Sequence, residues 1–111
     1  MKIKLFVLIF LFFTSNFASA DTTVAGKITQ VKMFSLPGGL GGFAIYMNEL
    51  APACGSSDPR RVLIKSDHPI FSTVVASALA AKMANSDIEI VHSGTCTVLD
   101  HAWDFVMLLV K

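Results

Sequence analysis

Residues 54–96, CGSSDPRRVLIKSDHPIFSTVVASALAAKMANSDIEIVHSGTC, decide the fold. The stretch begins and ends with the only two cysteines of the chain. Between them we expect a short strand at residues 60–65, one helix at residues 68–85 and a strand at residues 88–92. Two strand-like segments precede this stretch and one follows it. The expected order is therefore strand, strand, strand, helix, strand, strand.

The start and the end of the helix are marked by residues suited to those positions. Asp67 or His68 can cap its N-terminus, and Pro69 fits the first helical position, where the N–H has no partner to lose. Asn85 fits the position just after the helix. Seven residues form one broad apolar face that we expect to pack on the core: Ile70, Phe71, Val74, Val75, Ala78, Leu79 and Met83.

The opposite face of the helix consists of small residues, and Lys82 is the only charge in the helix interior. Alanine is the best helix former, so this face could serve helix stability alone. Alternatively, small side chains let another helix or a partner approach closely, which would make this face an oligomer interface. The residues assigned to that interface are Ala76, Ser77, Ala80, Ala81 and Ala84.

The segments outside the two cysteines show strand patterns. Residues 24–34 form the expected first strand, with a bulge eased by Gly26. Residues 35–42 contain four glycines and one proline and predict a hairpin turn. Residues 43–49 alternate, which directs Phe43, Ile45 and Met47 toward the core. Residues 103–110 are apolar in both phases, which is typical of a strand that is central or covered on both faces.

The same alternation places Tyr46 and Asn48 on the outer face of the second strand. A tyrosine ring can stack on a ligand, and an asparagine amide both donates and accepts hydrogen bonds. These two residues are therefore the predicted ligand-binding residues.

The first twenty residues have the pattern of a signal peptide. Lys2 and Lys4 precede the apolar run of residues 5–13, and Ala18-Ser19-Ala20 is a small-x-small cleavage signal. Nine apolar residues are too few to cross a bilayer, which needs about 20. We expect cleavage between Ala20 and Asp21, a single mature domain of residues 21–111, no membrane span in that domain, and a secreted or periplasmic location in a bacterium.

Export also bears on the cysteines and on the charge. In an oxidising compartment Cys54 and Cys96 are expected to form a disulfide, and the alternatives are a free thiol pair or a metal site.

The mature residues contain seven Lys and Arg against eight Asp and Glu, a net charge of −1. A nearly neutral domain lacks the positive surface that nucleic-acid binding requires. We therefore expect no nucleic-acid partner.

The histidines and cysteines carry no recognisable catalytic or metal-binding pattern. His68, His92 and His101 show no zinc-ligand spacing with the cysteines. His101 lies close to Asp100 and Asp104 in the sequence, but no serine or cysteine has a nucleophile motif around it. The sequence therefore predicts a protein that is not an enzyme, with no metal and no cofactor.

The element order is that of the oligonucleotide/oligosaccharide-binding barrel, the OB-fold. The mature chain also resembles small exported bacterial proteins grouped with the B subunit of subtilase cytotoxin. Four short segments carry this resemblance: Val24-Ala25-Gly26-Lys27-Ile28, Ala53-Cys54-Gly55, Leu79-Ala80-Ala81-Lys82 and Gly94-Thr95-Cys96. The resemblance implies a mainly β, five-stranded OB-like barrel and a pentameric ring that binds sialylated glycans, without identifying sugar-contacting residues.

The sequence thus favours an exported, non-catalytic binding module that recognises a glycan or a partner surface as an oligomer. The alternative is a monomeric periplasmic OB-fold domain with a structural or protein-partner role.

Overall fold

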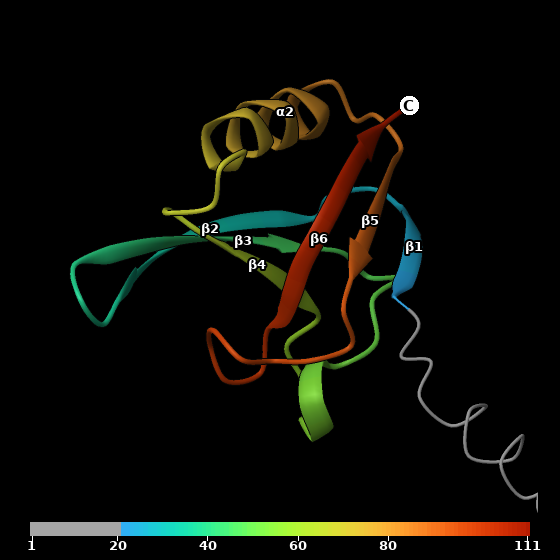
Figure 1. The fold of residues 1–111 in the computed structure, drawn as a ribbon. Helices are drawn as coiled ribbons and strands as arrows, with labels where there is room; N and C mark the ends of the chain where they lie inside the picture. Colours follow the sequence, from blue (N-terminus) through green and yellow to red (C-terminus); the bar gives the residue numbers. More distant parts are fainter. Residues whose placement is uncertain (1–20) are drawn as a thin grey trace, which may run out of the picture.

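A computed structural model describes residues 21–111, and the predicted signal peptide and Ala20 lie outside this range. The described part is mainly β-structure with one α-helix (Figure 1). The elements in chain order are β1 (Thr22–Gly26), β2 (Gln30–Leu36), β3 (Leu40–Tyr46), a 3-10 turn (Ala53–Gly55), β4 (Arg61–Lys65), α2 (Phe71–Met83), β5 (Ile88–His92) and β6 (Trp103–Val110). No helix among these residues is long and apolar enough to cross a membrane.

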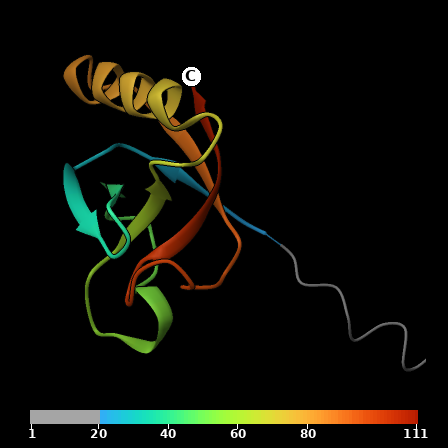
Figure 2. The same cartoon turned by 60° about the vertical axis from the view of Figure 1, so that its left-hand side comes forward.

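The six strands form one sheet in the order β1-β5-β6-β4-β3-β2. All neighbours are antiparallel except β4 and β6, which are parallel. The two edge strands, β1 and β2, are consecutive in the sequence. A flat six-stranded sheet would be about 24 Å wide, whereas the chain from Gly26 to Gln30 can span at most about 14 Å. The sheet therefore curls strongly, and α2 lies across one end of it (Figure 2).

The prediction of a closed five-stranded barrel is wrong in two respects. The expected first strand, residues 24–34, is divided into β1 and β2 by residues 27–29, so the sheet has six strands. Within the described residues β1 pairs with β5 and β2 pairs with β3, and no ladder joins β1 to β2. A break of three residues, rather than a bulge of one, lets the chain pass from one sheet edge to the other.

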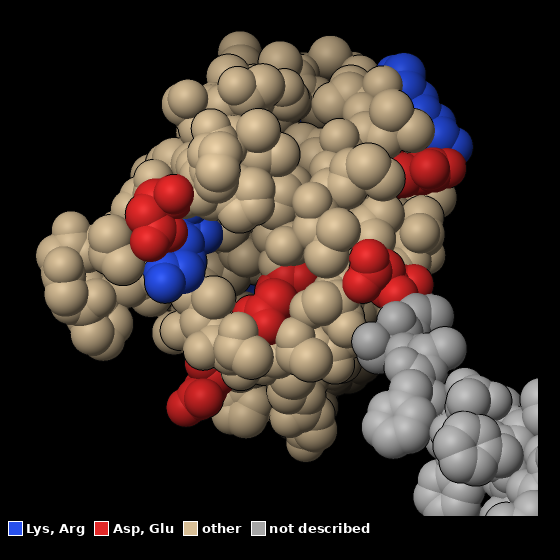
Figure 3. All heavy atoms as spheres, in the orientation of Figure 1, with Lys and Arg blue, Asp and Glu red and all other residues tan. Residues whose placement is uncertain are grey.

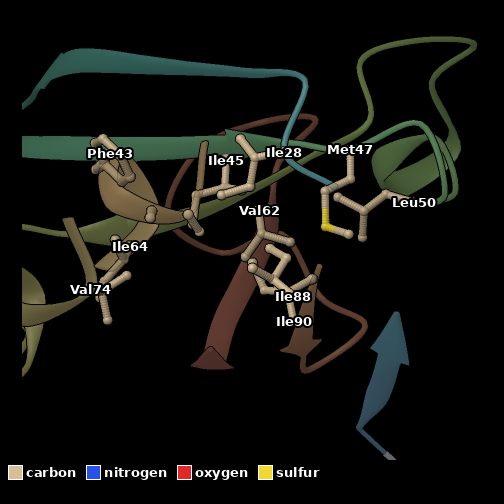
Figure 4. Packing of buried hydrophobic residues seen from close by; sticks show 12 residues of the cluster. Ile28, Phe43, Ile45, Met47, Leu50, Val62, Ile64, Val74, Ile88 and Ile90 are labelled. Carbon is tan, nitrogen blue, oxygen red and sulfur yellow. The ribbon is translucent and has the colours of Figure 1, made fainter. Parts of the chain in front are cut away.

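The main core lies inside the curled sheet. Figure 4 shows side chains from β3, β4, β5 and α2 pointing toward one another. The prediction that Phe43, Ile45 and Met47 enter the core is confirmed, because each is 1% exposed, whereas Ala44, expected on the outer face, is also fully buried. Ile88 and Ile90 of β5 are fully buried. Burial of each such side chain stabilises the fold by about 1.5–3 kcal/mol.

A second, smaller core covers the other face of β3 and β4. It consists of Leu36, Ala44, Leu63 and Ala102, and Tyr46 packs at its margin. The loop before β6 supplies the cover, since Val98 and Leu99 pack on this cluster. At their centre, β3 and β4 are therefore covered by apolar side chains on both faces.

The residues of α2 that are buried in the core differ in part from those predicted. Val74 and Ala78 are buried as expected, but Ala81 is also buried, at 2% exposure. Leu79 and Met83, expected in the core, are 41% and 88% exposed. Val74, Ala78 and Ala81 belong to the buried core cluster, and Phe71 and Val75 pack against it.

The disulfide prediction is confirmed. Cys54 and Cys96 are bonded, with 6.3 Å between their Cα atoms, and the described residues contain no free cysteine. The bond joins the loop after β3 to the loop before β6 across 42 residues of chain. The hairpin between β2 and β3 turns at Gly38 and Gly39, whose φ angles of 84° and 75° favour glycine.

Candidate ligand-binding site

A cleft among the described residues lies where β2, the end of β3 and the start of β4 meet. Its volume is about 360 Å³, which is within the range of small-ligand sites. Both predicted ligand-binding residues, Tyr46 and Asn48, line it. The complete lining is Thr29, Gln30, Lys32, Tyr46, Met47, Asn48, Asp58, Pro59, Arg60 and Arg61.

Tyr46 occupies the middle of a row of three residues across the sheet. Strand register places Gln30 on one side of it and Arg61 on the other. The Nη1 of Arg61 donates a hydrogen bond of 2.9 Å to the Tyr46 hydroxyl. The Nζ of Lys32 lies 5.3 Å from the centre of the same ring, within the range of a cation–π contact. The ring is thus fixed between two cations.

Arg61 is a positioning residue in this cleft. Its Nε and Nη2 donate to the carbonyl oxygens of His101 and Asp100, at 3.0 and 3.2 Å. Its guanidinium also stacks 5.1 Å from the centre of the Phe34 ring. Because these contacts use all three of its nitrogens, Arg61 ties the loop before β6 to Tyr46.

Several Lys and Arg side chains line the cleft, although the net charge of the domain is close to zero. Residues 21–111 contain seven Lys and Arg. Three of them form ion pairs within this range: Lys27 with Asp87, Lys65 with Asp67 and Lys111 with Glu89. The other four are Lys32, Arg60, Arg61 and Lys82.

Three of these four cations line the cleft, and Asp58 is the only carboxylate in its lining. Arg60 is anchored there by a hydrogen bond of 2.7 Å from its Nη1 to the Leu50 carbonyl. Cations without a carboxylate partner create a positive potential that favours an anionic ligand.

A smaller hollow of about 180 Å³ lies where β4 and β6 diverge. Phe105 and the His68 ring, in edge contact at 5.8 Å, form part of its wall. Asp104 also lines it, but its carboxylate already accepts hydrogen bonds from the side chains of Thr95 and Thr97 and from the amides of Thr97 and Val98. Burial opposes ionisation of Asp104, yet these hydrogen bonds outweigh it and lower its pKa. Asp104 therefore organises the loop.

Trp103 is an aromatic residue suited to ligand stacking, but its side chain makes its contacts with other residues of the fold. Its ring stacks on His92 with 4.6 Å between ring centres, and its Nε1 donates to the Ala51 carbonyl at 3.0 Å. His92 is 3% exposed, and its Nδ1 accepts a hydrogen bond from the Gly94 amide. Burial lowers the pKa of His92, and the charge of Asp21 partly offsets this effect.

The predicted oligomer interface on α2 is only partly at the surface. Ala76, Ala80 and Ala84 are exposed, and Ser77 is half-buried. Ala81 belongs to the core cluster, so its side chain cannot meet a partner, and this part of the prediction is corrected.

Lys32 and Arg60 are the cleft residues that sequence reasoning missed as binding candidates. The adjacent Arg60 and Arg61 could be seen in the sequence, but two basic residues alone do not indicate an anion-binding site. The third cation of the cleft, Lys32, is distant from them in the sequence. Strand pairing brings Lys32 close, because β2 and β4 flank β3.

Comparisons with protein-family models, with curated proteins and with solved structures find no match to this chain. Among the described residues no group of three or more His, Cys, Asp and Glu is placed to hold a metal ion.

Proposed function

We propose that the mature domain is an exported, non-catalytic binding module that recognises a glycan carrying an anionic group through the cleft at Tyr46 and Asn48. The observation that carries this proposal is the convergence of three cations on that cleft. The sequence resemblance to toxin B subunits and the curled sheet support the same function. As part of the proposal, the domain acts as an oligomer.

The cleft residues have distinct roles in this proposal. Lys32 and Arg60 attract the anionic group of the ligand, and the Asn48 amide bonds to sugar hydroxyls. Tyr46 offers an edge of its ring, held in place by Arg61. The cleft is shallow and polar, as suits a sugar that keeps part of its hydration.

A glycan array containing matched acidic and neutral sugars, followed by calorimetry with the best acidic sugar, tests the proposal. We expect Lys32→Gln to weaken binding at least tenfold, which corresponds to about 1.4 kcal/mol. Binding should also weaken as salt rises, since the charges lie at the surface. Lys82→Gln is the matched control, because Lys82 is the one cation of the four that lies outside the cleft.

An array without acidic hits, or equal binding to an acidic sugar and its neutral counterpart, would contradict this function. The second candidate would then gain weight: a monomeric exported domain with a structural or protein-partner role. The observation that favours it is that each guanidinium nitrogen of Arg61 already donates a hydrogen bond within the chain.

A further inference from the structure

Among residues 21–111, His92 is the only polar or charged residue that is buried, with 3% of its surface exposed. It ends β5, and its Nδ1 accepts a hydrogen bond of 3.1 Å from the amide of Gly94. Gly94 lies near the beginning of the loop at residues 93–102, which connects β5 to β6. A neutral imidazole can accept this bond, whereas a protonated imidazole carries a hydrogen on both nitrogens and accepts none. The hydrogen bond therefore exists only while His92 is neutral.

Strand β6 begins beside His92 and is less exposed at its start than at its end. At the start, β4 pairs with Trp103 and Asp104, and the Trp103 Nε1 donates to the Ala51 carbonyl at 3.0 Å. Trp103 is therefore anchored from two sides. The expectation that residues 103–110 are covered on both faces is wrong for the second half of the strand, where Val106, Met107, Leu109 and Val110 are 39%, 53%, 49% and 42% exposed.

The anchored ring of Trp103 fixes the orientation of the His92 ring. The two rings stack with 4.6 Å between their centres and 18° between their planes. A protonated imidazole keeps such a stack, because the face of an aromatic ring attracts a cation. Protonation therefore leaves the His92 ring in place and puts its new N–H opposite the N–H of Gly94. Two donors cannot form a hydrogen bond with each other, so this contact is lost.

Burial and the nearest carboxylate act on His92 in opposite directions. Burial lowers the pKa of His92 from its ordinary 6.5, and the charge of Asp21, which precedes the β1 partner of His92, partly offsets this effect. After the predicted cleavage, the α-amino group of Asp21 adds a positive charge at the same place. β6 contributes Asp104, whose carboxylate is bound to the loop at residues 93–102.

The remaining charges around these strands lie farther from His92. In the space-filling view, carboxylates lie near the starts of β1 and β6, and most of the visible Lys and Arg atoms lie at the edges of the view (Figure 3). The other described charged groups on or beside β1, β5 and β6 lie at the far ends of these strands: Lys27 with Asp87, Glu89 with Lys111, and Glu49 beside Gly26.

Hydrogen bonds connect the Gly94 end of the loop with its middle. Thr95, the residue after Gly94, donates from its Oγ1 to the Asp104 carboxylate, and its carbonyl accepts from the Asp104 amide at 2.8 Å. The same carboxylate accepts a hydrogen bond of 3.3 Å from the amide of Val98. A displacement of Gly94 and Thr95 therefore reaches Val98 through Asp104.

The far end of the loop positions the cleft. Val98 packs on the small core cluster against which Tyr46 also packs. The carbonyl oxygens of Asp100 and His101 accept hydrogen bonds from Arg61, which in turn donates to the Tyr46 hydroxyl. The place of Tyr46 in the cleft thus depends on the loop that His92 holds at its other end.

We propose that His92 makes ligand binding at the cleft sensitive to pH: protonation in acid breaks its bond to Gly94 and shifts the loop that positions Arg61 and Tyr46. At neutral pH His92 is neutral, the loop is held and the cleft is formed. The disulfide at Cys96 keeps the loop attached in acid, so the domain stays folded while the cleft loses affinity. Because binding and protonation are linked, a bound ligand should in turn lower the pKa of His92.

The change in affinity rests on the proposed function, whereas the response of the loop does not. An isotope-labelled mature domain without ligand is titrated from about pH 7.5 down to the onset of acid unfolding. We expect the amide signals of Gly94, Tyr46 and residues 99–101 to shift with the same midpoint as the imidazole signals of His92. Signals of Tyr46 and residues 99–101 that stay constant through this transition overturn the proposal. It is equally overturned if His92 stays neutral until the domain unfolds.

Sialyllactose is the probe for the cleft, and lactose is its neutral counterpart. Its dissociation constant should rise about fivefold or more through the His92 transition, the lower end of the usual coupling between sites. His92→Asn tests the cause, because the Oδ1 of asparagine takes the place of Nδ1 and accepts a hydrogen bond at every pH. The affinity of this variant should not change over the same range.

His68→Gln is the matched control. The His68 Nδ1 also accepts a backbone hydrogen bond, from the Ile70 amide at 3.3 Å, but it lies outside the cleft and the loop. This variant should keep the pH dependence of wild type. Near-ultraviolet circular dichroism of Trp103 verifies the fold of His92→Asn, and if the variant does not fold, the ligand-free titration of wild type decides alone.

The two proposals fail in different ways. A pH dependence of binding that persists in folded His92→Asn overturns the role of His92 and leaves the function of the cleft standing. Sialyllactose that binds at no pH, together with a loop that follows the titration of His92, would refute the proposed function and leave the loop response standing.

Discussion

Removal of the disulfide should cost about 4 kcal/mol of folding free energy. The perturbation is the double substitution Cys54→Ala, Cys96→Ala. The bond closes 42 residues of chain, and the chain-entropy relation for a loop of that length gives about 4 kcal/mol at 25 °C. Cys54 is exposed and Cys96 is half-buried. Loss of the sulfur atoms therefore leaves little cavity, and the entropy of the unfolded chain dominates the change.

Such a loss is large for a domain of this size. Small domains have total stabilities near the lower end of the usual range of about 5–15 kcal/mol. Each kcal/mol shifts the Tm of a 60–100-residue domain by about 4–8 °C, so the Tm should fall by about 15–30 °C.

Urea unfolding at neutral pH, monitored by Trp103 fluorescence, measures the change in the free energy of unfolding. Ser57→Ala, an exposed position in the same loop as Cys54, is the control and should alter stability by less than about 0.5 kcal/mol. A loss below about 1 kcal/mol in the double variant would refute the reasoning, because the loops would then be held together by other contacts.

Two further predictions concern titratable side chains. Because burial lowers the pKa of His92 from its ordinary 6.5, its contribution to stability is complete above pH 6.5 and is lost as the pH falls below 6.5 through the lowered value. Trp103, the only tryptophan, stacks on His92, so its emission should change as the pH falls below 6.5, and an emission that stays constant down to the onset of acid unfolding contradicts this prediction. Asp104→Asn removes a charged acceptor of several loop hydrogen bonds and should cost about 1–2 kcal/mol in urea unfolding, while exposed Asp100→Asn should change little.

Local patterns predicted β3, β4 and β5 because apolar residues alternate along these segments. The alternation of Phe43, Ile45 and Met47 identified the residues that enter the main core, and the same holds for Ile88 and Ile90 in β5. The disulfide followed from two cysteines in a chain that is predicted to be exported. These features depend on neighbours in the sequence or on composition.

Features that depend on distant contacts were not predictable. The division of residues 24–34 into β1 and β2 follows from the closeness of the two sheet edges, which no local pattern records. On α2, the residues that meet the core depend on how the helix docks against the sheet, and in the structure Ala81 is buried while Met83 is exposed. The spacing of the apolar residues along the helix does not show which of them are buried.

The candidate site shows the same division. Tyr46 and Asn48 were identified from their phase in β3, and both line the cleft. Lys32 was missed because it reaches the cleft through the pairing of β2 with β3, and Arg60 because its role depends on Lys32, which lines the same cleft. Whether these residues bind a glycan remains a prediction.

Chemical-shift mapping with an isotope-labelled mature domain tests the central claim most directly. Titration with an acidic oligosaccharide that scored on the array should shift the amide signals of residues 29–32, 46–48 and 58–61, and its neutral counterpart should shift them far less. Shifts confined to other residues, or equal shifts with both sugars, would contradict the account of an anion-binding cleft.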